Sequence, residues 1–453
     1  MPKEKLSTDE LKKKAEKPGK DALVLHPFYK GKIQSIGKVP VRSFDDFAIW
    51  YTPGVAKACN AIKEDPTEVY SMTNKGNMVA VVSDGTRVLG LGNIGPEAAG
   101  PVMEGKSILF KYLGGVDAWP VCLDTKEKDE IIQTVKFLQP SFGGINLEDI
   151  EKPKCYHVLE ELRNHPDVNI PVWHDDAQGT GTVVLAGVLG ALRVVKKDIE
   201  NVTIRMLGVG AANTRTAYLL IAAGVDPKNI IMVDSTGAIY SDREDIVEEK
   251  DYDIFKYDLA QKTNPDRMTG DLGEVINGAD ILIAASRPVP GTIKKEWVEK
   301  MADDSIVFAC ANPLPEIWPW DAKDAGAKIV GTGRSDFDNQ INNSLGFPGI
   351  FRGTLDVRAS TITDEMCVAA AEALAELGAK EANEEKVIPT MDQWELYPLE
   401  ATAVGMKAIE QGIAQKEWEQ DDLYKHAEDV IRTARAASEV LYSKGYIPKA
   451  PKT

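Results

Sequence analysis

The sequence predicts an α/β protein, because short apolar runs that suit strands alternate along the chain with longer segments that suit helices. An apolar helical segment near residues 183–192 separates two groups of expected strands. The first group comprises residues 78–83, 116–124, 143–150 and 170–173. The second group comprises residues 201–207, 229–233, 281–285, 305–309 and 328–331. Such alternation is typical of parallel sheets with helices on both faces.

We expect the chain to have three parts. An N-terminal α/β domain covers residues 1–177, and residues 1–40 form an arm that could pack on the body or on a second subunit. A doubly wound, Rossmann-like domain covers residues 178–355. From residue 356 to 453 the sequence predicts packing helices, with amphipathic spacing over residues 363–377, 401–413 and 421–443.

The composition limits the classes of partner and compartment. The chain has 453 residues and a formal net charge of −17, and a polyanion is a poor partner for nucleic acid or an anionic membrane. Five cysteines without a CxxC pair argue for a reducing compartment, expected to be the cytoplasm, and against disulfides or a zinc site. The Lys- and Glu-rich start lacks the apolar core of a signal peptide, and no uninterrupted apolar run reaches the ~18 residues of a membrane span.

Two pairs of acidic residues follow expected strands directly. Glu148 and Asp149 come at the end of one strand, and Asp175 and Asp176 come after the next. Ligands bind α/β proteins at the carboxyl ends of strands, and carboxylate oxygens suit Mg²⁺ or Mn²⁺. The same acids could instead cap the following helices or lie in solvated first turns. The repetition of the pattern favours a divalent-metal site.

Four other polar residues are candidates for chemistry. Lys106 lies in an apolar helical segment, where it could be a buried general base or could extend to solvent. Tyr51 precedes a Pro-Gly turn, where a tyrosine is usually half-buried packing. Asn312 and Asn343 follow strands of the second domain and could bind a carboxylate or simply form turns.

A βαβ unit with a dinucleotide-binding pattern opens the second domain. The strand at 201–207 leads into a helix through Gly208, Gly210, Ala211, Ala212 and Asn213, and the next strand ends in Asp234. Gly208 suits the tight turn, and Gly210 lets a pyrophosphate reach backbone N–H groups at the helix start. Asn213 stands where a third Gly or Ala is usual, so we expect looser packing there. A second glycine series at residues 90–95 lacks an acid partner and is weak evidence.

The choice between NAD and NADP stays open. Asp234 could hold the ribose hydroxyls and would repel a 2′-phosphate, which favours NAD. Arg243 lies nine positions further on and could compensate that charge, which would admit NADP.

Seven motifs, taken in order, resemble the malic enzyme family in its short bacterial or archaeal form. They are residues 51–55 (YTPGV), 88–95 (VLGLGNIG), 104–106 (EGK), 146–149 (NLED), 174–180 (HDDAQGT), 311–313 (ANP) and 347–349 (FPG). The likeness runs from about residue 20 to residue 450, and a chance match would not keep so many motifs in the family's order.

The resemblance implies oxidative decarboxylation of (S)-malate to pyruvate and CO₂, with NAD or NADP and a divalent cation, Mg²⁺ or Mn²⁺, in a homodimer. By the same resemblance, Glu148, Asp149 and Asp176 match the metal ligands. Lys106 matches the general base that takes the C2 hydroxyl proton, and Asp175 matches its hydrogen-bond partner.

Four further roles rest on the same resemblance. Tyr51 matches the general acid that protonates the enolate of pyruvate. Asn312 and Asn343 match substrate contacts, and Asn312 is also expected to border the cofactor. Arg87 matches an arginine that holds a malate carboxylate in larger members of the family, whereas short forms tend to have a small residue there.

Other functions compete with this one. The same residues could carry out a malolactic conversion of malate to lactate with a bound NAD. A non-catalytic dinucleotide-binding regulator belongs to a different class, but Lys106 and Tyr51, which it would not need, are both present. An amino-acid dehydrogenase would need no acid-pair metal site.

Overall fold

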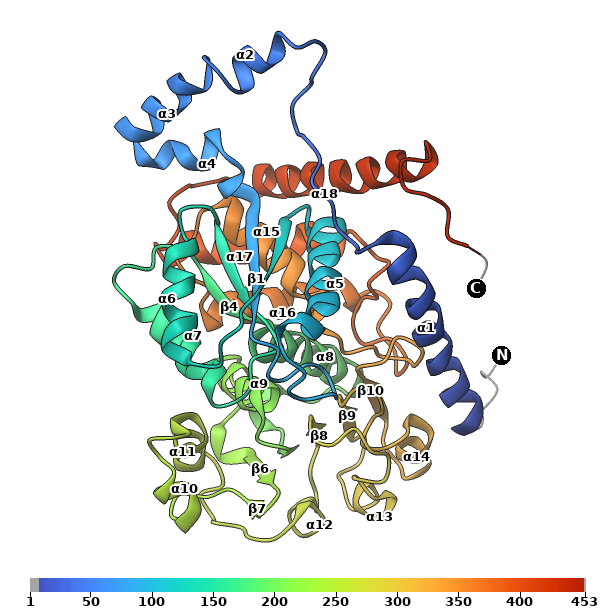
Figure 1. The fold of residues 1–453 in the computed structure, drawn as a ribbon. Helices are drawn as coiled ribbons and strands as arrows, with labels where there is room; N and C mark the ends of the chain where they lie inside the picture. The colour runs from blue at the N-terminus through green and yellow to red at the C-terminus, as the bar shows by residue number, and fades with distance from the viewer. Residues whose placement is uncertain (1–7, 452–453) are drawn as a thin grey trace.

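The computed structural model describes residues 8–451 and contains two sheets of mainly parallel strands, one in each half of the molecule, with helices around them (Figure 1). The sequence-based prediction of an α/β protein with a Rossmann-like second domain is therefore confirmed. The boundaries between the three expected parts stay a prediction.

The first sheet has the strand order β2-β1-β3-β4, and all its neighbouring strands are parallel. Its strands are β1 (Met78–Ser83), β2 (Asp117–Cys122), β3 (Gly144–Leu147) and β4 (Val172–His174). Side chains alternate along β1, so Val79 and Val81 join one core while Ala80 and Val82 join another on the opposite face. The carboxyl ends of β3 and β4 are adjacent, because Leu147 pairs with His174.

The second sheet has the strand order β10-β9-β8-β5-β6-β7, and only β7 is antiparallel among its described strands. Its strands are β5 (Ile204–Leu207), β6 (Ile230–Asp234), β7 (Gly237–Ala238), β8 (Ile281–Ala284), β9 (Ile306–Ala309) and β10 (Ile329–Thr332). The chain moves outward from β5 to one side and then returns to β8 on the other. This reversal between β5 and β8 is the switch point at which doubly wound sheets bind ligands.

Helices of the first half surround the first sheet or precede it. They are α1 (Thr8–Tyr29), α2 (Asp46–Trp50), α3 (Val55–Glu64), α4 (Val69–Met72), α5 (Pro96–Gly114), α6 (Lys128–Leu138) and α7 (Lys154–Asn164). Buried residues of α6 and α7 share a core with one face of β1, and buried residues of α5 share a core with the other face.

The remaining helices follow the first sheet. They are α8 (Thr180–Val195), α9 (Ala211–Ala222), α10 (Glu244–Glu248), α11 (Ile254–Lys262), α12 (Leu272–Val275), α13 (Lys295–Val298), α14 (Pro319–Asp324), α15 (Phe347–Asp356), α16 (Asp364–Ala379), α17 (Leu396–Glu410) and α18 (Gln420–Ser443). The helices α12 to α14 share a core with one face of the second sheet, whereas α8 and α9 share a core with the other.

The helix α8 lies at the centre of the protein. Together with the π-helical turn η3 (Asp175–Gly179) before it, residues 175–195 form the one helix in the described chain that is long and apolar enough to cross a membrane, by length and composition only. However, 72% of the apolar 18-residue window in this segment is buried inside the protein. Its apolar character is explained by packing, because α8 shares one core with both sheets and the C-terminal helices.

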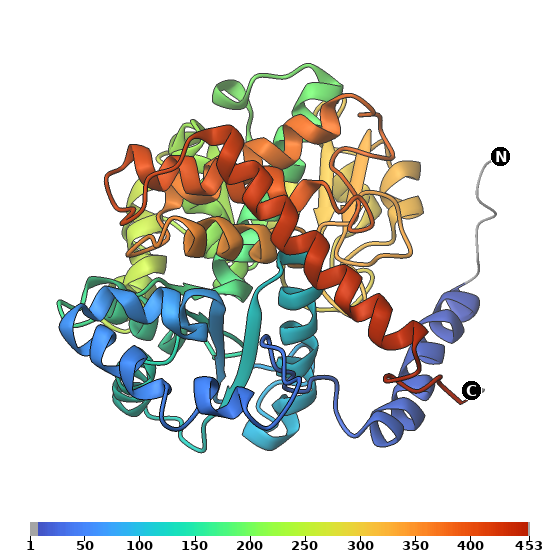
Figure 2. The same cartoon turned by 90° about the horizontal axis from the view of Figure 1, so that it is seen from above.

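The C-terminal helix α18 crosses over the molecule and ends beside α1 (Figure 2). The Tyr29 hydroxyl donates a hydrogen bond to the carbonyl of Pro448, 3.0 Å away, so the two ends of the described chain are tied together. By contrast, α2 and α3 form a projecting arm, distinct from the arm expected at residues 1–40. This projecting arm stands away from the body, beyond the amino end of β1 (Figure 1).

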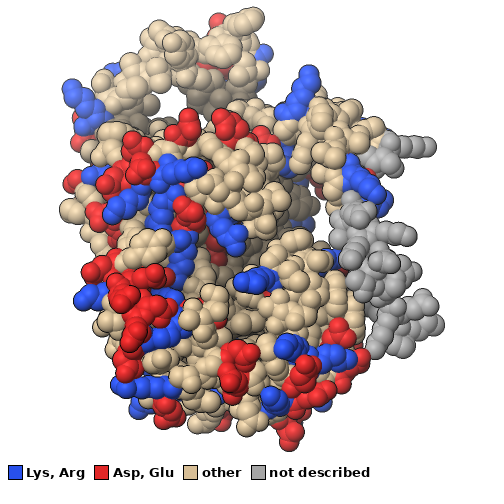
Figure 3. Space-filling view, turned by 60° about the horizontal axis from the view of Figure 1, so that its bottom comes forward, with Lys and Arg blue, Asp and Glu red and all other residues tan. Residues whose placement is uncertain are grey.

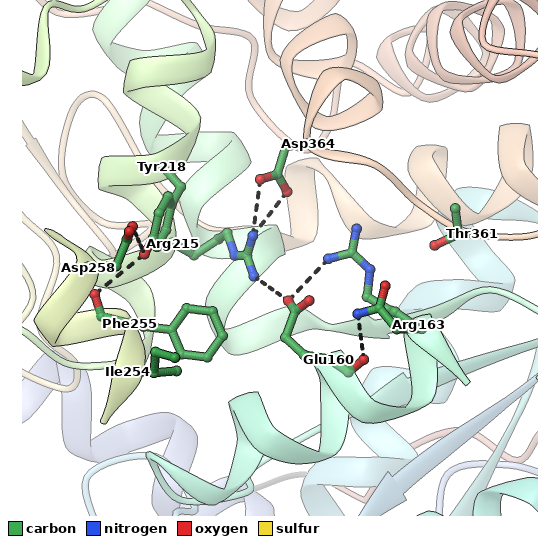
Figure 4. Close-up of a pocket in the computed structure, with 10 residues that line it drawn as sticks. Glu160, Arg163, Arg215, Tyr218, Ile254, Phe255, Asp258, Thr361 and Asp364 are labelled. Carbon is green, nitrogen blue, oxygen red and sulfur yellow. Dashed lines mark hydrogen bonds and ion pairs between the residues drawn. The ribbon is translucent and has the colours of Figure 1, made fainter. Parts of the chain in front are cut away.

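A buried arginine joins three parts of the chain. Arg215 on α9 donates to Asp364 at the start of α16 and to Glu160 on α7, each at 3.1 Å (Figure 4). These groups line a cavity of about 590 Å³ whose apolar wall includes Ile254 and Phe255. Because the arginine's charge is shared between both carboxylates, it holds α9 against α7 and α16.

Candidate active site

The two predicted acid pairs lie together at one edge of the first sheet. Glu148 and Asp149 follow β3, and Asp175 and Asp176 follow the adjacent strand β4. The backbone N–H of Asp149 donates to the Asp176 carboxylate at 2.8 Å. Asp149 adopts a left-handed conformation, with φ of 55°, which is uncommon for a residue with a side chain. Backbone strain of this kind clusters at functional sites.

Lys106 reaches these acids from the helix α5. Its ammonium group lies 2.6 Å from Asp175 Oδ2 and 2.9 Å from Glu148 Oε1, and it is 4.5 Å from the centre of the Phe347 ring. The side chain is only 8% exposed, so it does not extend to solvent. The structure thus places Lys106 and Asp175 in direct contact, as expected.

The glycine in the motif at residues 174–180 has a steric reason. A Cβ atom at Gly179 would lie 1.8 Å from Asp175 Oδ1, so any side chain there would displace the carboxylate that holds Lys106. Asp175 Oδ1 also accepts a hydrogen bond of 3.3 Å from the Trp173 indole. The space left by Gly179 and the hydrogen bond from Trp173 together fix the orientation of Asp175.

The charges of this cluster are unbalanced. Burial raises the pKa of Asp175 to about 6, against the attraction of Lys106. Burial and the nearby carboxylates also raise the pKa of Glu148 and of Asp149. Burial lowers the pKa of Lys106, but Asp175 and Glu148 outweigh it and raise that pKa above its ordinary value. The cluster therefore holds more negative charge than one ammonium can neutralise.

The residues of this cluster fit a hard divalent cation. Among residues 8–451, no three His, Cys, Asp or Glu side chains converge on one point as a finished metal site. Yet Asp149 Oδ2 is buried and has no hydrogen-bond partner in the part of the chain that the structure describes. Glu148 and Asp176 supply further carboxylate oxygens beside it. Oxygen donors and excess negative charge are what Mg²⁺ and Mn²⁺ require.

The glycine turn after β5 has the geometry of a dinucleotide loop. Gly208 has a φ of 96°, and a Cβ atom there would lie 2.6 Å from the carbonyl of Ala285 at the end of β8. A Cβ atom at Gly210 would meet nothing within 4 Å, so the space beside it is open. The helix α9 begins at Ala211 and continues through Ala212, with their N–H groups at its free end.

Asn213 corrects one expectation about this loop. Its amide donates to the carbonyls of Leu207 and Gly208, at 2.9 and 3.0 Å, and the residue is 1% exposed. The side chain therefore ties α9 to the turn, and the prediction of looser packing was wrong. The hydrogen bonds replace the close backbone contact that a third glycine usually allows.

The predicted ribose-binding acid lies in the same region as this loop. Asp234 ends β6 and, together with Gly208 and Val209, lines a cavity of about 510 Å³. Its carboxylate contacts Arg243 and Lys256. The residue is thus placed beside the glycine turn, as the sequence predicted.

The predicted substrate residues lie on loops near these elements. Asn312 follows β9, is exposed, and its carbonyl lies 3.3 Å from where a Cβ of Gly90 would be. Two loops from opposite halves of the protein therefore meet there. Asn343 begins a short turn, η6 (Asn343–Leu345), directly before α15. The Arg87 side chain is exposed, while its backbone N–H donates to the carbonyl of Asp149 at 2.9 Å.

Tyr51 is the expected site residue that this chain does not bring to the cluster. It directly follows α2 and is 70% exposed. The helix α2 lies on the projecting arm, beyond the amino end of β1 (Figure 1). Glu148 and Asp175 lie instead at the carboxyl ends of the strands. The alternative of half-buried packing at Tyr51 therefore does not hold, and its role as the general acid stays a prediction.

Several buried ionisable residues were not singled out from the sequence, and His174 and Glu400 are two whose side chains lack hydrogen-bond partners in the described chain. Neither ring nitrogen of His174 has a hydrogen-bond partner in the described chain, and burial lowers its pKa to about 4. Glu400 on α17 is also buried without a partner, and its Oε2 lies 2.1 Å from where a Cβ of Gly349 would be. The signal for Glu400 was a single acid within the apolar segment at residues 396–406.

Comparison with known proteins gives matches along most of the chain. The family model described as "Malic enzyme, N-terminal domain" matches residues 30–163, and "Malic enzyme, NAD binding domain" matches residues 177–409. A relative from Bacillus subtilis called "Bifunctional malic/malolactic enzyme" is 50% identical over 87% of this chain and 94% of its own length. The "NAD-dependent malic enzyme" of Geobacillus stearothermophilus is 50% identical over 85% of this chain and 78% of its own length.

A solved structure is similar over nearly the whole chain. The malic enzyme of Entamoeba histolytica is 44% identical, with a TM-score of 0.95, and the likeness covers 99% of this chain and 93% of the other. The similarity thus includes both sheets and the C-terminal helices.

Proposed function

The chain belongs to the malic enzyme family, and we propose that it oxidises (S)-malate at C2 and decarboxylates it to pyruvate and CO₂ while it reduces a nicotinamide cofactor. The observation that carries the proposal is the buried Lys106, held by Asp175 and Glu148 where two parallel strands end. The segment that follows Glu148 also contacts the glycine loop, because Lys152 donates to the carbonyl of Val209 at 2.7 Å. The contacts with Asp175 and Glu148 give a proton-transferring group a fixed position.

The chain's own residues divide into proton transfer and ligand binding. When bound, a nicotinamide would accept the C2 hydride, and a divalent cation held by Glu148, Asp149 and Asp176 would polarise the C2 oxygen. Lys106 takes the proton of the C2 hydroxyl, and Asp175 orients it. Because Asp175 and Glu148 raise its pKa, Lys106 must first lose a proton, which neutralisation of Glu148 favours.

Substrate binding is proposed for residues around this cluster. Asn312 and Asn343 would hold the malate carboxylates through their amides, and Asn312 also borders the cofactor. Arg87, whose backbone contacts Asp149, would place its guanidinium against a carboxylate. Malate is a dianion, so a positive group must accompany the acid cluster.

Protonation of the enolate at C3 needs an acid, and the described part of this chain does not bring Tyr51 to the cluster. We propose that Tyr51 supplies this proton in the site of a second copy. The arm exposes a row of large apolar side chains: Phe44, Phe47, Ile49, Trp50 and Tyr51 are 43 to 90% exposed. Large apolar side chains exposed close together are typical of a protein interface, and in a symmetric dimer each arm would complete the partner's site.

Complementation between two inactive variants tests the shared site. Lys106→Ala and Tyr51→Phe should each be inactive alone, because each lacks one proton-transferring group. Mixed under conditions that exchange subunits, they should recover up to about a quarter of wild-type activity, since half the sites of a mixed dimer hold both groups. If Tyr51 acted within its own chain, every site of the mixed dimer would lack one group and no activity would return.

A malolactic activity is the second candidate, because the Bacillus subtilis relative is called a bifunctional malic/malolactic enzyme. The two reactions share residues and differ in the fate of the reduced cofactor. Product analysis after turnover of malate separates them. Equal amounts of pyruvate and NADH support the proposed reaction, whereas lactate without net NADH supports the malolactic one.

A further inference from the structure

The cavity beside the glycine turn contains an ordered network of charges around Asp234. This acid ends β6, where the adenosine ribose of a dinucleotide lies in this fold. Its Oδ1 accepts hydrogen bonds from the backbone N–H groups of Thr236 and Gly237 at 2.8 and 3.1 Å, and from Arg243 Nη1 at 3.0 Å. Its Oδ2 contacts Arg243 Nη2 and lies 2.7 Å from Lys256 Nζ. The carboxylate is fixed and fully paired.

Arg243 has no free donor for a further anion. It binds Asp234 through both terminal nitrogens, and it binds Asp245 at 2.7 and 2.8 Å through Nε and Nη2. Its remaining N–H points to the carbonyls of Gly237 and Ala238, at 3.1 and 3.2 Å. A guanidinium carries five N–H donors, and these contacts use all of them. Arg243 therefore cannot compensate for Asp234 in the way that the sequence left open.

The two lysines of the cavity differ from each other. Lys152 Nζ contacts Asp253 at 2.9 Å, the carbonyl of Val209 at 2.7 Å and the Thr214 hydroxyl at 3.3 Å, so its three donors are used. In the described chain, Lys256 Nζ contacts Asp234 alone among the carboxylates and retains N–H donors. Its charge is committed to Asp234, but its geometry would let it bind another oxygen.

The balance of charge in the cavity is negative. Four carboxylates, those of Asp234, Asp245, Glu249 and Asp253, accompany three cations, Lys152, Arg243 and Lys256. The nearby surface of α10 and α11 adds exposed acids, and Figure 3 shows red side chains gathered along the side of the molecule where these helices lie. A 2′-phosphate would bring about two more negative charges into this region. A ribose hydroxyl would bring none.

We propose that Asp234 makes this chain select NAD and exclude NADP, and that Arg243 and Lys256 form a 2′-phosphate site that Asp234 blocks. The network explains both halves of the proposal. While Asp234 is present, every cation is paired and the phosphate meets a fixed carboxylate. Once Asp234 is removed, two guanidinium donors and the Lys256 ammonium become free at the same place. The inference rests on the proposed function only in requiring that the chain bind a nicotinamide dinucleotide.

Direct binding measurements test the selection without turnover. Isothermal titration calorimetry with NAD and NADP on the wild type should give about 100-fold tighter binding of NAD or more, since the 2′-phosphate and the Asp234 carboxylate repel each other. Adenosine 2′-monophosphate and adenosine 5′-monophosphate repeat the comparison without the nicotinamide. If the wild type binds NADP as tightly as NAD, the inference is overturned, and this result depends on no variant.

Two variants test the blocked site. Asp234→Ser should reverse the preference and strengthen NADP binding by at least about tenfold, and Asp234→Ser with Lys256→Ala should lose that gain. Asp226→Ser is the matched control, because Asp226 is exposed in the turn before β6, at the other end of the strand, and should change neither affinity. An unchanged NADP affinity in a folded Asp234→Ser protein would overturn the proposal that Asp234 blocks a 2′-phosphate site.

The outcomes separate this inference from the proposed function. Binding of neither dinucleotide by the wild type would overturn both. Tight NADP binding, with malate oxidation intact, would overturn the inference and leave the proposed function standing.

Discussion

Replacing Asp356 with Asn should destabilise the protein far more than its position in a helix suggests. Asp356 and Arg352 are four residues apart on α15, and the arginine binds both carboxylate oxygens, at 3.0 and 2.6 Å. Their side chains are 2 and 3% exposed. Arg352 also donates to the Asn77 side chain at 2.5 Å, just before β1, and His426 of α18 lies 3.1 Å from Asp356. The pair thus links the first sheet to two C-terminal helices.

The size of the expected loss of stability in Asp356→Asn follows from the burial of the ion pair rather than from helix geometry. Asn cannot neutralise the buried guanidinium, and breaking one partner of a buried ion pair costs about 3–5 kcal/mol. Glu428 and Arg432 on α18 are a matched control: they too are four residues apart, at 2.9 Å, but the arginine side chain is 61% exposed. Glu428→Gln should therefore cost only about 0.3–0.5 kcal/mol. Urea unfolding of the three proteins, followed by circular dichroism, gives the comparison.

The effect of pH provides a second check on the same residue. Burial would raise the pKa of Asp356, but Arg352 and His426 lower it below its ordinary value. A carboxyl with a lowered pKa stabilises the folded state above its unfolded pKa, and the contribution is lost as pH falls through the folded value. The gap between wild type and Asp356→Asn should thus be constant near neutral pH and close in acid. A cost near that of the Glu428→Gln control at neutral pH would refute the reasoning.

Three further predictions concern the loop, the core and the metal. Gly208→Ala should weaken dinucleotide binding by at least about tenfold, because φ is 96° and the new Cβ would lie 2.6 Å from the carbonyl of Ala285. Gly224 has a similar φ of 107° but open space around it, so Gly224→Ala introduces backbone strain without crowding. Equal effects of the two variants on binding measured by calorimetry would contradict the steric argument. Gly349→Ala should cost about 1–3 kcal/mol of unfolding free energy through its clash with Glu400, and the cost should shrink in a Glu400→Ala background; an unchanged cost there would remove Glu400 from the explanation. Asp149→Asn should lower Mn²⁺ affinity at least about tenfold, because even the loss of a residue that only hydrogen-bonds a metal ligand has an effect of this size. Unchanged Mn²⁺ binding, measured by electron paramagnetic resonance, would exclude Asp149 as a ligand.

The sheets and the acid cluster could be predicted from the sequence because local signals decide them. The expected strand at residues 78–83 is β1, and expected strands at 281–285 and 305–309 differ from β8 and β9 by one residue at an end. Buried parallel strands are short apolar runs bounded by Gly, Asp or Pro, and such runs are visible in the sequence. Because neighbouring parallel strands end at one edge, the meeting of Glu148 and Asp175 followed from strand order.

What the sequence did not reveal depends on contacts between distant segments. The residues around Tyr51 do not indicate whether the segment that carries it folds back onto its own chain or extends to a second copy. Arg243 was a free cation in the sequence, but the structure surrounds it with Asp234, Asp245 and two carbonyls. The pairing of Glu400 with Gly349 joins two helices far apart in the chain. Local pattern carries no information about such partners.

The most direct test of the central claim is malate-dependent formation of NADH, with Mn²⁺ or with a chelator, by the wild type and by Lys106→Ala. Lys111→Ala on the same helix α5 is the matched control, because its ammonium lies 2.8 Å from Asp117 and away from the acid cluster. The account predicts metal-dependent NADH formation that Lys106→Ala lowers by roughly 10²–10⁴-fold and Lys111→Ala leaves unchanged. Turnover that persists in Lys106→Ala, or that the chelator does not affect, would contradict the assignment of this cluster as the active site.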